Sequence, residues 1–106
     1  MDPAELITVV IPTSPSPKHP STHLIDGAIE SIRKQIPGVP ILVQVDGLRE
    51  ENANRRDQYA EYKLRLIDKW VGTPNMDVYM AEGFRHQAEL CRETFHMIHT
   101  PLLVYL

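Results

Sequence analysis

Four short apolar runs alternate along the chain with three longer segments in which apolar residues recur at helical spacing. The runs are residues 6–11 (LITVVI), 41–45 (ILVQV), 76–80 (MDVYM) and 101–106 (PLLVYL). A short, nearly continuous aliphatic run is typical of a strand buried on both faces. We therefore predict four strands, and we expect the last of them to be buried like the first.

The segments between the runs carry apolar residues three and four positions apart, as amphipathic helices do. The first predicted helix, residues 23–36, stops at Pro37-Gly38. The second, residues 50–70, is highly charged but repeats large apolar side chains at helical spacing. The third covers residues 81–100, and its predicted apolar face consists of Phe84, Ala88, Cys91, Phe95 and Ile98.

Strands and helices thus alternate from the first strand to the last. Because strand–helix–strand crossovers are almost always right-handed, this order predicts a mainly parallel four-stranded sheet with helices on both faces. The predicted fold class is α/β, a Rossmann-like three-layer α/β/α arrangement. A chain of 106 residues and 12.1 kDa fits one domain, residues 1–106.

Composition narrows the class of protein further. With 42% hydrophobic and 24% charged residues the chain is globular, and its net charge of -3 gives no uniform basic field for nucleic acid. The single cysteine, Cys91, has no internal disulfide partner, and no export signal is evident, so we expect a cytoplasmic protein. The apolar runs are far shorter than the roughly 20 residues of a membrane helix.

Ligands of open α/β sheets bind beyond the carboxyl ends of the strands. In this chain those ends hold Pro12-Thr13, Asp46-Gly47 and the turn at residues 81–83, with Arg85 nearby. No GxGxxG follows the first strand, and the chain has no GxxxxGK[ST] motif. A dinucleotide site of the usual kind and a P-loop are therefore not expected.

Three motifs follow one another at a recognisable spacing: residues 7–13 (ITVVIPT), 28–40 (AIESIRKQIPGVP) and 41–47 (ILVQVDG). In this the chain resembles the start of family 2 glycosyltransferases of the GT-A fold. Those enzymes open with a VSVVIPT-like strand, continue through a helix of the type ESIxxQ and reach a VDDGS-like turn. The segment PLLVYL resembles the strand that delivers the family's DxD motif. The resemblance covers the whole chain but only about half of a family catalytic domain.

The resemblance assigns roles to five residues. Pro12 and Thr13 match residues that line the nucleotide base and ribose, and Asp46, followed by Gly47, matches the acidic residue that hydrogen-bonds the uracil or ribose. Arg85 lies where members of the family have an Arg or Asn near the base and diphosphate. Simpler interpretations stand beside these: Pro12 ends a strand, Asp46-Gly47 is a turn sequence, and Arg85 is a solvated residue at a helix start.

The chain departs from the family pattern at the third motif, the VDDGS-like turn. Val45 stands where the first Asp of the VDDGS-like turn would be, and Leu48 replaces its Ser. This departure leaves the identity of the base open.

The resemblance also implies a chemistry. The donor would be a UDP- or GDP-sugar, the acceptor a hydroxyl group, and Mn²⁺ or Mg²⁺ would offset the charge of the leaving diphosphate. The metal-binding DxD and the catalytic base would both follow Leu106. We therefore expect residues 1–106 to be a fragment that has no metal ligands and no transfer activity of its own. Its last strand, left uncovered, would offer an edge for homo-oligomers.

Other chemistry-bearing residues have more ordinary interpretations. His96 and His99 are three apart on one helix but lack a third zinc ligand at suitable spacing. Cys91 is expected to be a buried core thiol, and Lys18 and His19 to be solvated. Three aromatic residues at helical spacing favour a core position over a sugar platform: Tyr59, Tyr62 and Trp70.

The alternative function is that of a non-catalytic α/β module which binds a partner or a small ligand. A receiver domain is a poor version of it, because receiver domains need acidic residues after the first strand. Here Pro12, Thr13 and Ser14 occupy that place.

Overall fold

The computed structural model describes residues 2–13, 21–48, 54–85 and 87–106. Its strands form one all-parallel sheet in the order β3-β2-β1-β4. The strands are β1 (Ile7–Thr13), β2 (Ile41–Val45), β3 (Met76–Met80) and β4 (Leu102–Tyr105). The α/β class and the parallel four-stranded sheet predicted from the sequence are thus confirmed.

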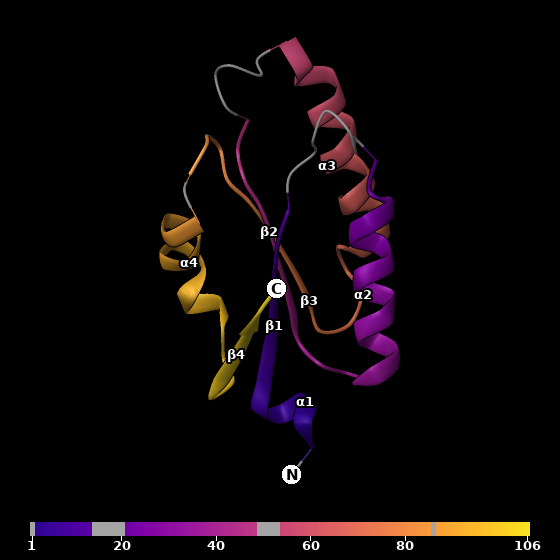
Figure 1. Ribbon diagram of the computed structural model, residues 1–106, viewed down its shortest axis with the longest axis vertical. Helices are drawn as coiled ribbons and strands as arrows, with labels where there is room; N and C mark the ends of the chain where they lie inside the picture. Colours follow the sequence, from indigo (N-terminus) through magenta and orange to yellow (C-terminus); the bar gives the residue numbers. More distant parts are fainter. Residues whose placement is uncertain (1, 14–20, 49–53, 86) are drawn as a thin grey trace.

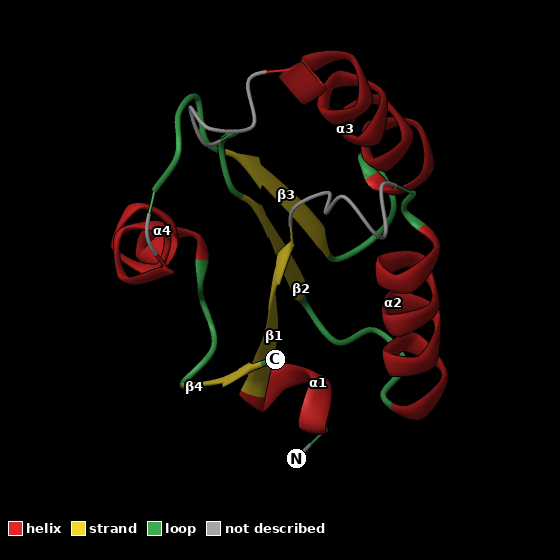
Figure 2. Ribbon diagram, turned by 45° about the horizontal axis from the view of Figure 1, so that its top comes forward, coloured by secondary structure: helices red, strands yellow, loops and turns green. Residues whose placement is uncertain are grey.

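Helices lie on both faces of this sheet (Figure 1). Helices α2 (His23–Gln35) and α3 (Arg56–Trp70) cover one face, and α4 (Gln87–Thr94) lies on the other, as Figure 2 shows from a second direction. A one-turn helix α1 (Pro3–Leu6), which the sequence pattern did not predict, precedes β1, and a 3₁₀ turn η2 (Phe95–Met97) follows α4. The arrangement is compatible with a Rossmann-like three-layer fold.

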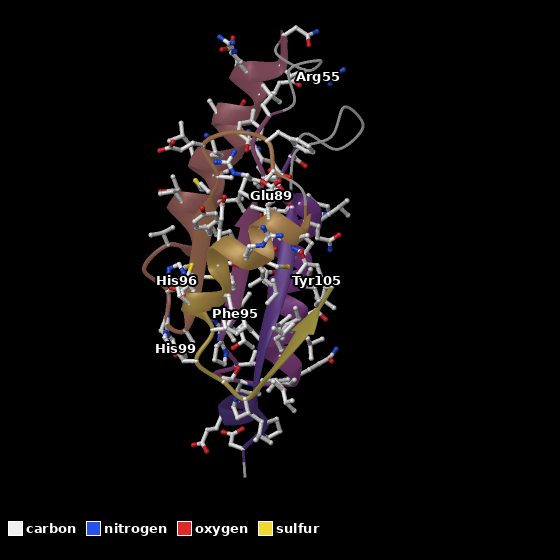
Figure 3. The ribbon with its side chains drawn as sticks, turned by 90° about the vertical axis from the view of Figure 1, so that its left-hand side faces the viewer. Arg55, Glu89, Phe95, His96, His99 and Tyr105 are labelled. Carbon is white, nitrogen blue, oxygen red and sulfur yellow. The ribbon has the colours of Figure 1, made fainter. Side chains whose placement is uncertain are left out.

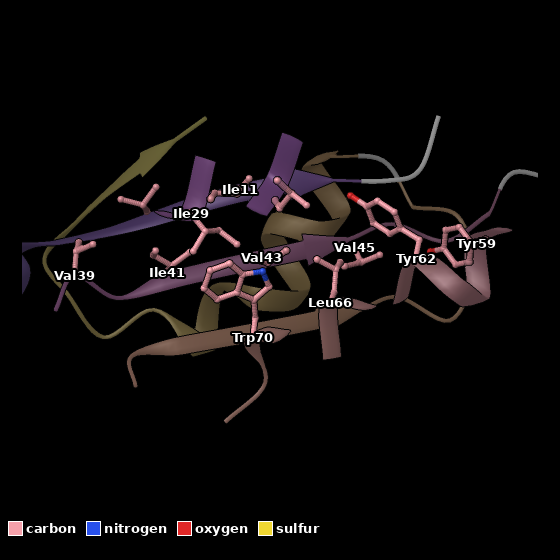
Figure 4. Packing of buried hydrophobic residues seen from close by; sticks show 12 residues of the cluster. Ile11, Ile29, Val39, Ile41, Val43, Val45, Tyr59, Tyr62, Leu66 and Trp70 are labelled. Carbon is pink, nitrogen blue, oxygen red and sulfur yellow. The ribbon is translucent and has the colours of Figure 1, made fainter. Parts of the chain in front are cut away.

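The two central strands are buried on both faces. Val43 and Val45 of β2 belong to the core beneath α2 and α3, together with Ile29, Leu66 and Trp70 (Figure 4). Successive side chains of a strand point to opposite faces, so the intervening residues of β1 and β2 face α4. Those residues are also buried: Thr8, Val10, Leu42 and Gln44.

The aromatic residues of α3 lie in the core, as predicted. Tyr59, Tyr62 and Trp70 are all at most 9% exposed. The indole Nε1 of Trp70 donates a 2.7 Å hydrogen bond to Oδ1 of Asp26 on α2, which joins the two helices of this layer. These rings are therefore not a sugar platform.

Strand β1 runs two residues beyond its predicted end at Ile11. Pairing with β2 continues through Pro12 to Thr13, whereas pairing with β4 ends at Val10. The Val10 carbonyl accepts from Leu106 on the β4 side, so Pro12, two residues later, turns its nitrogen toward that same side. No ladder bond is lost there, because β4 has already ended.

The third helix is shorter than predicted, and a different face is buried. Residues 81–85 form no helix, α4 begins at Gln87, and Phe95, expected in the core, is 71% exposed. Leu90 and Thr94 are buried instead, one position away from the predicted stripe. The physical reason is the polar side chain of Gln44 beneath the helix, which pairs with Thr94 rather than with an apolar residue.

The prediction that β4 is buried is wrong. Leu102, Leu103 and Val104 are between 41% and 61% exposed. In the sheet formed by the described residues, the strand lies at the edge and pairs with β1 alone. An apolar run is compatible with such an edge because ladder hydrogen bonds, and not only burial, hold a strand in place.

Some sequence predictions fall outside the described residues. Lys18 and His19 lie in residues 14–20, and the first part of the predicted helix 50–70 lies in residues 49–53. Within the described ranges, no helix has the length and apolar character needed to cross a membrane.

Candidate functional site

A pocket of about 370 Å³ lies at the carboxyl ends of β1 and β2. The described residues that line it are Pro12, Thr13, Asp46, Gln87 and Leu90. The first two end β1, Asp46 directly follows β2, and the other two belong to the first turn of α4. The pocket therefore collects residues from three separate elements, and three of the five residues singled out from the sequence line it.

The position follows from the topology. The chain builds β1, β2 and β3 outward on one side, then crosses to place β4 on the other side of β1. Strand β1 thus borders the point where the connectivity reverses, and ligands of open α/β sheets bind outside the carboxyl ends of the strands at such a point. Pro12 and Asp46 occupy even-numbered positions, in phase with the strand residues that face α4.

Thr13 is held from the opposite side of the sheet. Its hydroxyl is hydrogen-bonded to the phenol oxygen of Tyr62 on α3. Burial raises the pKa of the Tyr62 phenol, so this phenol remains a neutral hydrogen-bonding group around neutral pH. Nothing in the sequence pattern connects Thr13 with Tyr62, which are 49 positions apart, and Tyr62 was expected only in the core.

Asp46 joins two loops at the rim of the pocket. Its Oδ1 accepts the backbone N–H of Gly47 at 2.7 Å and that of Arg85 at 2.6 Å. The contact with Arg85 ties the segment after β3 to the end of β2, and this structural role is additional to the ligand role expected for the carboxylate.

Gly47 is buried where two backbones meet. A Cβ atom added to it would lie 2.0 Å from the carbonyl carbon of Gly83 and 2.4 Å from the nitrogen of Phe84. Only a residue without a side chain permits this approach. Gly47 therefore contributes to the site by its size, as a close-packing position next to the pocket.

Arg85 reaches the site through its backbone, while its side chain turns elsewhere. The guanidinium Nε donates a 2.8 Å hydrogen bond to Oε1 of Glu93 on α4. The other carboxylate oxygen, Oε2, accepts from the phenol of Tyr79 on β3 at 2.5 Å. The hydrogen bonds from Tyr79 and from Arg85 lower the pKa of Glu93, and the same pairing raises the pKa of Arg85.

A polar network under α4 fixes the helix that carries Gln87 and Leu90. Gln44, only 1% exposed, donates from Nε2 to the hydroxyl of Thr94 at 2.9 Å and accepts from the phenol of Tyr105 at 2.9 Å. The Thr94 hydroxyl in turn donates to the Leu90 carbonyl. A buried polar side chain with both ends paired fixes the register of the elements that it joins.

Sequence reasoning missed two pocket residues, Gln87 and Leu90. The missed signal was the spacing of Gln87, Leu90 and Thr94 by three and four positions, a helical stripe with one apolar member. The predicted helix start at residue 81 hid it, because Gln87 then fell in the middle of a helix.

The described residues offer no metal centre. They contain no group of three or more His, Cys, Asp or Glu side chains placed to hold an ion, and Asp46 is the one carboxylate that lines the pocket. His96, in η2, and His99, in the loop between η2 and β4, are both exposed (Figure 3). These residues do not fit a divalent metal, so the ligands expected after Leu106 remain a prediction.

Comparison with known proteins leaves the family open. No protein-family model matches the chain, and neither the curated proteins nor the solved structures searched contain a match. The glycosyltransferase resemblance accordingly rests on the residue motifs and on their spacing.

Proposed function

We propose that the chain is the nucleotide-binding part of a glycosyltransferase that uses a nucleotide-diphosphate sugar as donor and a hydroxyl as acceptor. The observation that carries this proposal is the meeting of Pro12, Thr13 and Asp46 around one pocket at the end of β1. The resemblance had assigned these three residues to one nucleotide, although 33 positions separate Thr13 from Asp46 in the sequence. The GT-A type of the fold belongs to the same proposal.

The pocket offers suitable chemistry for a nucleoside. A carboxylate is an acceptor only, so Asp46 can receive the N–H of a base or the hydroxyls of a ribose. The Gln87 amide supplies both donors and acceptors, and the buried Leu90 supplies an apolar contact. The volume of about 370 Å³ lies within the range of small-molecule sites, about 300–1,000 Å³.

A thermal-shift panel tests the proposal. The chain is heated with UDP, GDP and other nucleoside diphosphates, with and without Mn²⁺, and we expect at least one to raise the melting temperature. Asp46→Asn should lose that shift. Asp77→Asn is the matched control, since it removes the same charge at an exposed position on β3, away from the pocket.

Two outcomes decide between the proposals. Stabilisation by a nucleoside diphosphate that Asp46→Asn abolishes supports the glycosyltransferase. Indifference of the intact protein to every nucleotide favours the non-catalytic α/β module instead. A cytoplasmic location and self-association through β4 remain predictions beside this proposal.

A further inference from the structure

We propose that Glu93 is a positioning residue which holds the Arg85 guanidinium away from the pocket, and that a phosphate-bearing ligand takes this arginine over from Glu93. This inference rests on the proposed function, because it concerns how the same pocket accepts an anion. It adds a role for Glu93, a residue that no motif singled out.

The described lining of the pocket is poorly suited to an anion. Among the described residues that line it, one is negatively charged, Asp46, and none is positively charged. A phosphate placed there would meet a carboxylate without a compensating cation, and like charges at such distances repel. An anionic ligand therefore needs a basic side chain in addition to these described lining residues.

Arg85 is a basic residue anchored to the pocket rim. Its backbone nitrogen lies 2.6 Å from Oδ1 of Asp46, a lining residue. Its side chain is 34% exposed and so remains accessible from solvent. A guanidinium presents five donors in a planar fork, which suits a phosphate as well as a carboxylate.

Glu93 occupies the place of that anion. Its Oε1 accepts from Arg85 Nε, while Tyr79 from β3 holds its Oε2. Tyr79 thus fixes the carboxylate from the strand side and keeps it directed toward Arg85. Glu93 and a ligand phosphate compete for the Arg85 guanidinium. In the free protein the guanidinium is bound to Glu93.

Glu93→Gln tests the competition. The amide keeps the size of the side chain and one acceptor oxygen, but a neutral acceptor binds a guanidinium more weakly than a carboxylate does. We expect the affinity for UDP, measured by isothermal titration calorimetry, to rise about fivefold. The affinity for uridine, which has no phosphate, should stay unchanged.

Glu89→Gln is the matched control. Glu89 is an exposed glutamate of the same helix whose charge acts on Arg85 without a hydrogen bond to it, so the variant changes the net charge equally. It should leave UDP affinity near that of the parent. In the double variant Glu93→Gln with Arg85→Gln, the gain should disappear, since the arginine that Glu93 releases is then missing.

The outcomes separate the two proposals. If the parent binds UDP and Glu93→Gln binds it no better, the role of Glu93 is wrong while the nucleotide site stands. If Glu89→Gln raises affinity as much as Glu93→Gln does, the effect is one of net charge and the role of Glu93 is again wrong. If the parent binds GDP and not UDP, the same comparison is made with GDP and guanosine. If neither parent nor Glu93→Gln binds UDP, GDP or either nucleoside, both proposals fail. Urea unfolding of each variant shows that a loss of affinity is not a loss of folding.

Discussion

The Oδ1 atom of Asp46 accepts two backbone N–H groups, and this makes the residue structural as well as a candidate ligand contact. Asp46→Ala should cost about 1–3 kcal/mol of stability, because both donors then lose their partner. Asp46→Asn keeps a side-chain oxygen acceptor and should retain most of that stability while losing nucleotide affinity. Urea unfolding together with calorimetry separates the two effects. Equal stability losses in both variants would show that the carboxylate charge, not its geometry, holds the loop.

Replacing Gly47 tests whether the close approach of two backbones forms the rim of the pocket. Gly47→Ala should destabilise the protein by about 1–3 kcal/mol, since its Cβ would overlap the Gly83 carbonyl. Gly27→Ala is the matched control, because nothing lies within 4 Å of its Cβ and alanine favours the helix by about 0.5–1 kcal/mol. Thermal unfolding of both variants gives the comparison. A Gly47→Ala protein as stable as the parent would contradict the packing described.

We expect the buried phenol of Tyr59 to make the protein less stable in alkaline solution. Its hydroxyl is buried without a hydrogen-bond partner among the described residues, and burial, with Asp46 and Tyr62 contributing, raises its pKa from 10.0 to about 12. Between these values the unfolded chain loses the phenol proton while the folded protein keeps it. Stability is therefore fully present below pH 10 and falls as the pH rises toward 12, by up to about 1.4 kcal/mol per pH unit.

Tyr59→Phe isolates this contribution. The variant should unfold in urea at a similar concentration to the parent at pH 8, and should lose less stability between pH 10 and pH 12. Tyr62, Tyr79 and Tyr105 also have raised pKa values and keep their share of the alkaline loss. Parallel pH profiles for the parent and Tyr59→Phe would contradict the assignment.

At the scale of elements, the contact between β2 and α4 depends on a polar pair. Thr94→Val removes the partner of the buried Gln44 amide, and this should cost about 1–3 kcal/mol. Gln44→Leu combined with Thr94→Val should cost less than the two single changes together, because the pair is removed as a unit. Chemical denaturation of the four proteins in the cycle gives the coupling. A coupling near zero would mean that α4 is held by other contacts.

The sequence pattern predicted some elements correctly and misplaced one helix. Strands β2 and β3 have the bounds that the pattern predicted, because local sequence marks them: Pro40 precedes β2 and Asp46-Gly47 follows it. The start of α4 was predicted too early, because the helical spacing of Phe84, Ala88 and Cys91 begins before Gln87, where the helix starts. Its buried face depends on Gln44, a residue 50 positions away.

The candidate site also has residues that the sequence predicts and residues that it does not. Pro12, Thr13 and Asp46 could be found in advance because parallel strands bring their carboxyl ends to one edge, whatever the details of packing. The residues that hold these side chains and Arg85 in place could not be found in advance. Tyr62 is 49 positions from Thr13 in the sequence, and nothing local connects the two. Glu93 is only eight positions from Arg85, but in the helix predicted over residues 81–100 the two would lie about two turns apart.

At the scale of the whole molecule, the open edge of β4 predicts self-association. Leu102, Leu103 and Val104 are exposed along a strand whose outer edge is unpaired within the described sheet. An exposed apolar edge of this kind favours pairing with another strand. Sedimentation velocity should show dimers that increase with concentration, and Val104→Lys should reduce them without lowering the melting temperature. A chain that stays monomeric at every concentration would contradict this prediction.

The central claim is that a nucleoside diphosphate binds at the carboxyl ends of β1 and β2. The most direct test is a titration of the ¹⁵N-labelled chain with UDP and with GDP, followed by the backbone amide signals in NMR spectra. Binding at this site should shift the amide signals of Thr13, Asp46, Gly47, Gln87 and Leu90, with the amides of α2 unchanged. Signals that stay in place at millimolar nucleotide, or that shift only on the opposite face of the sheet, would contradict it.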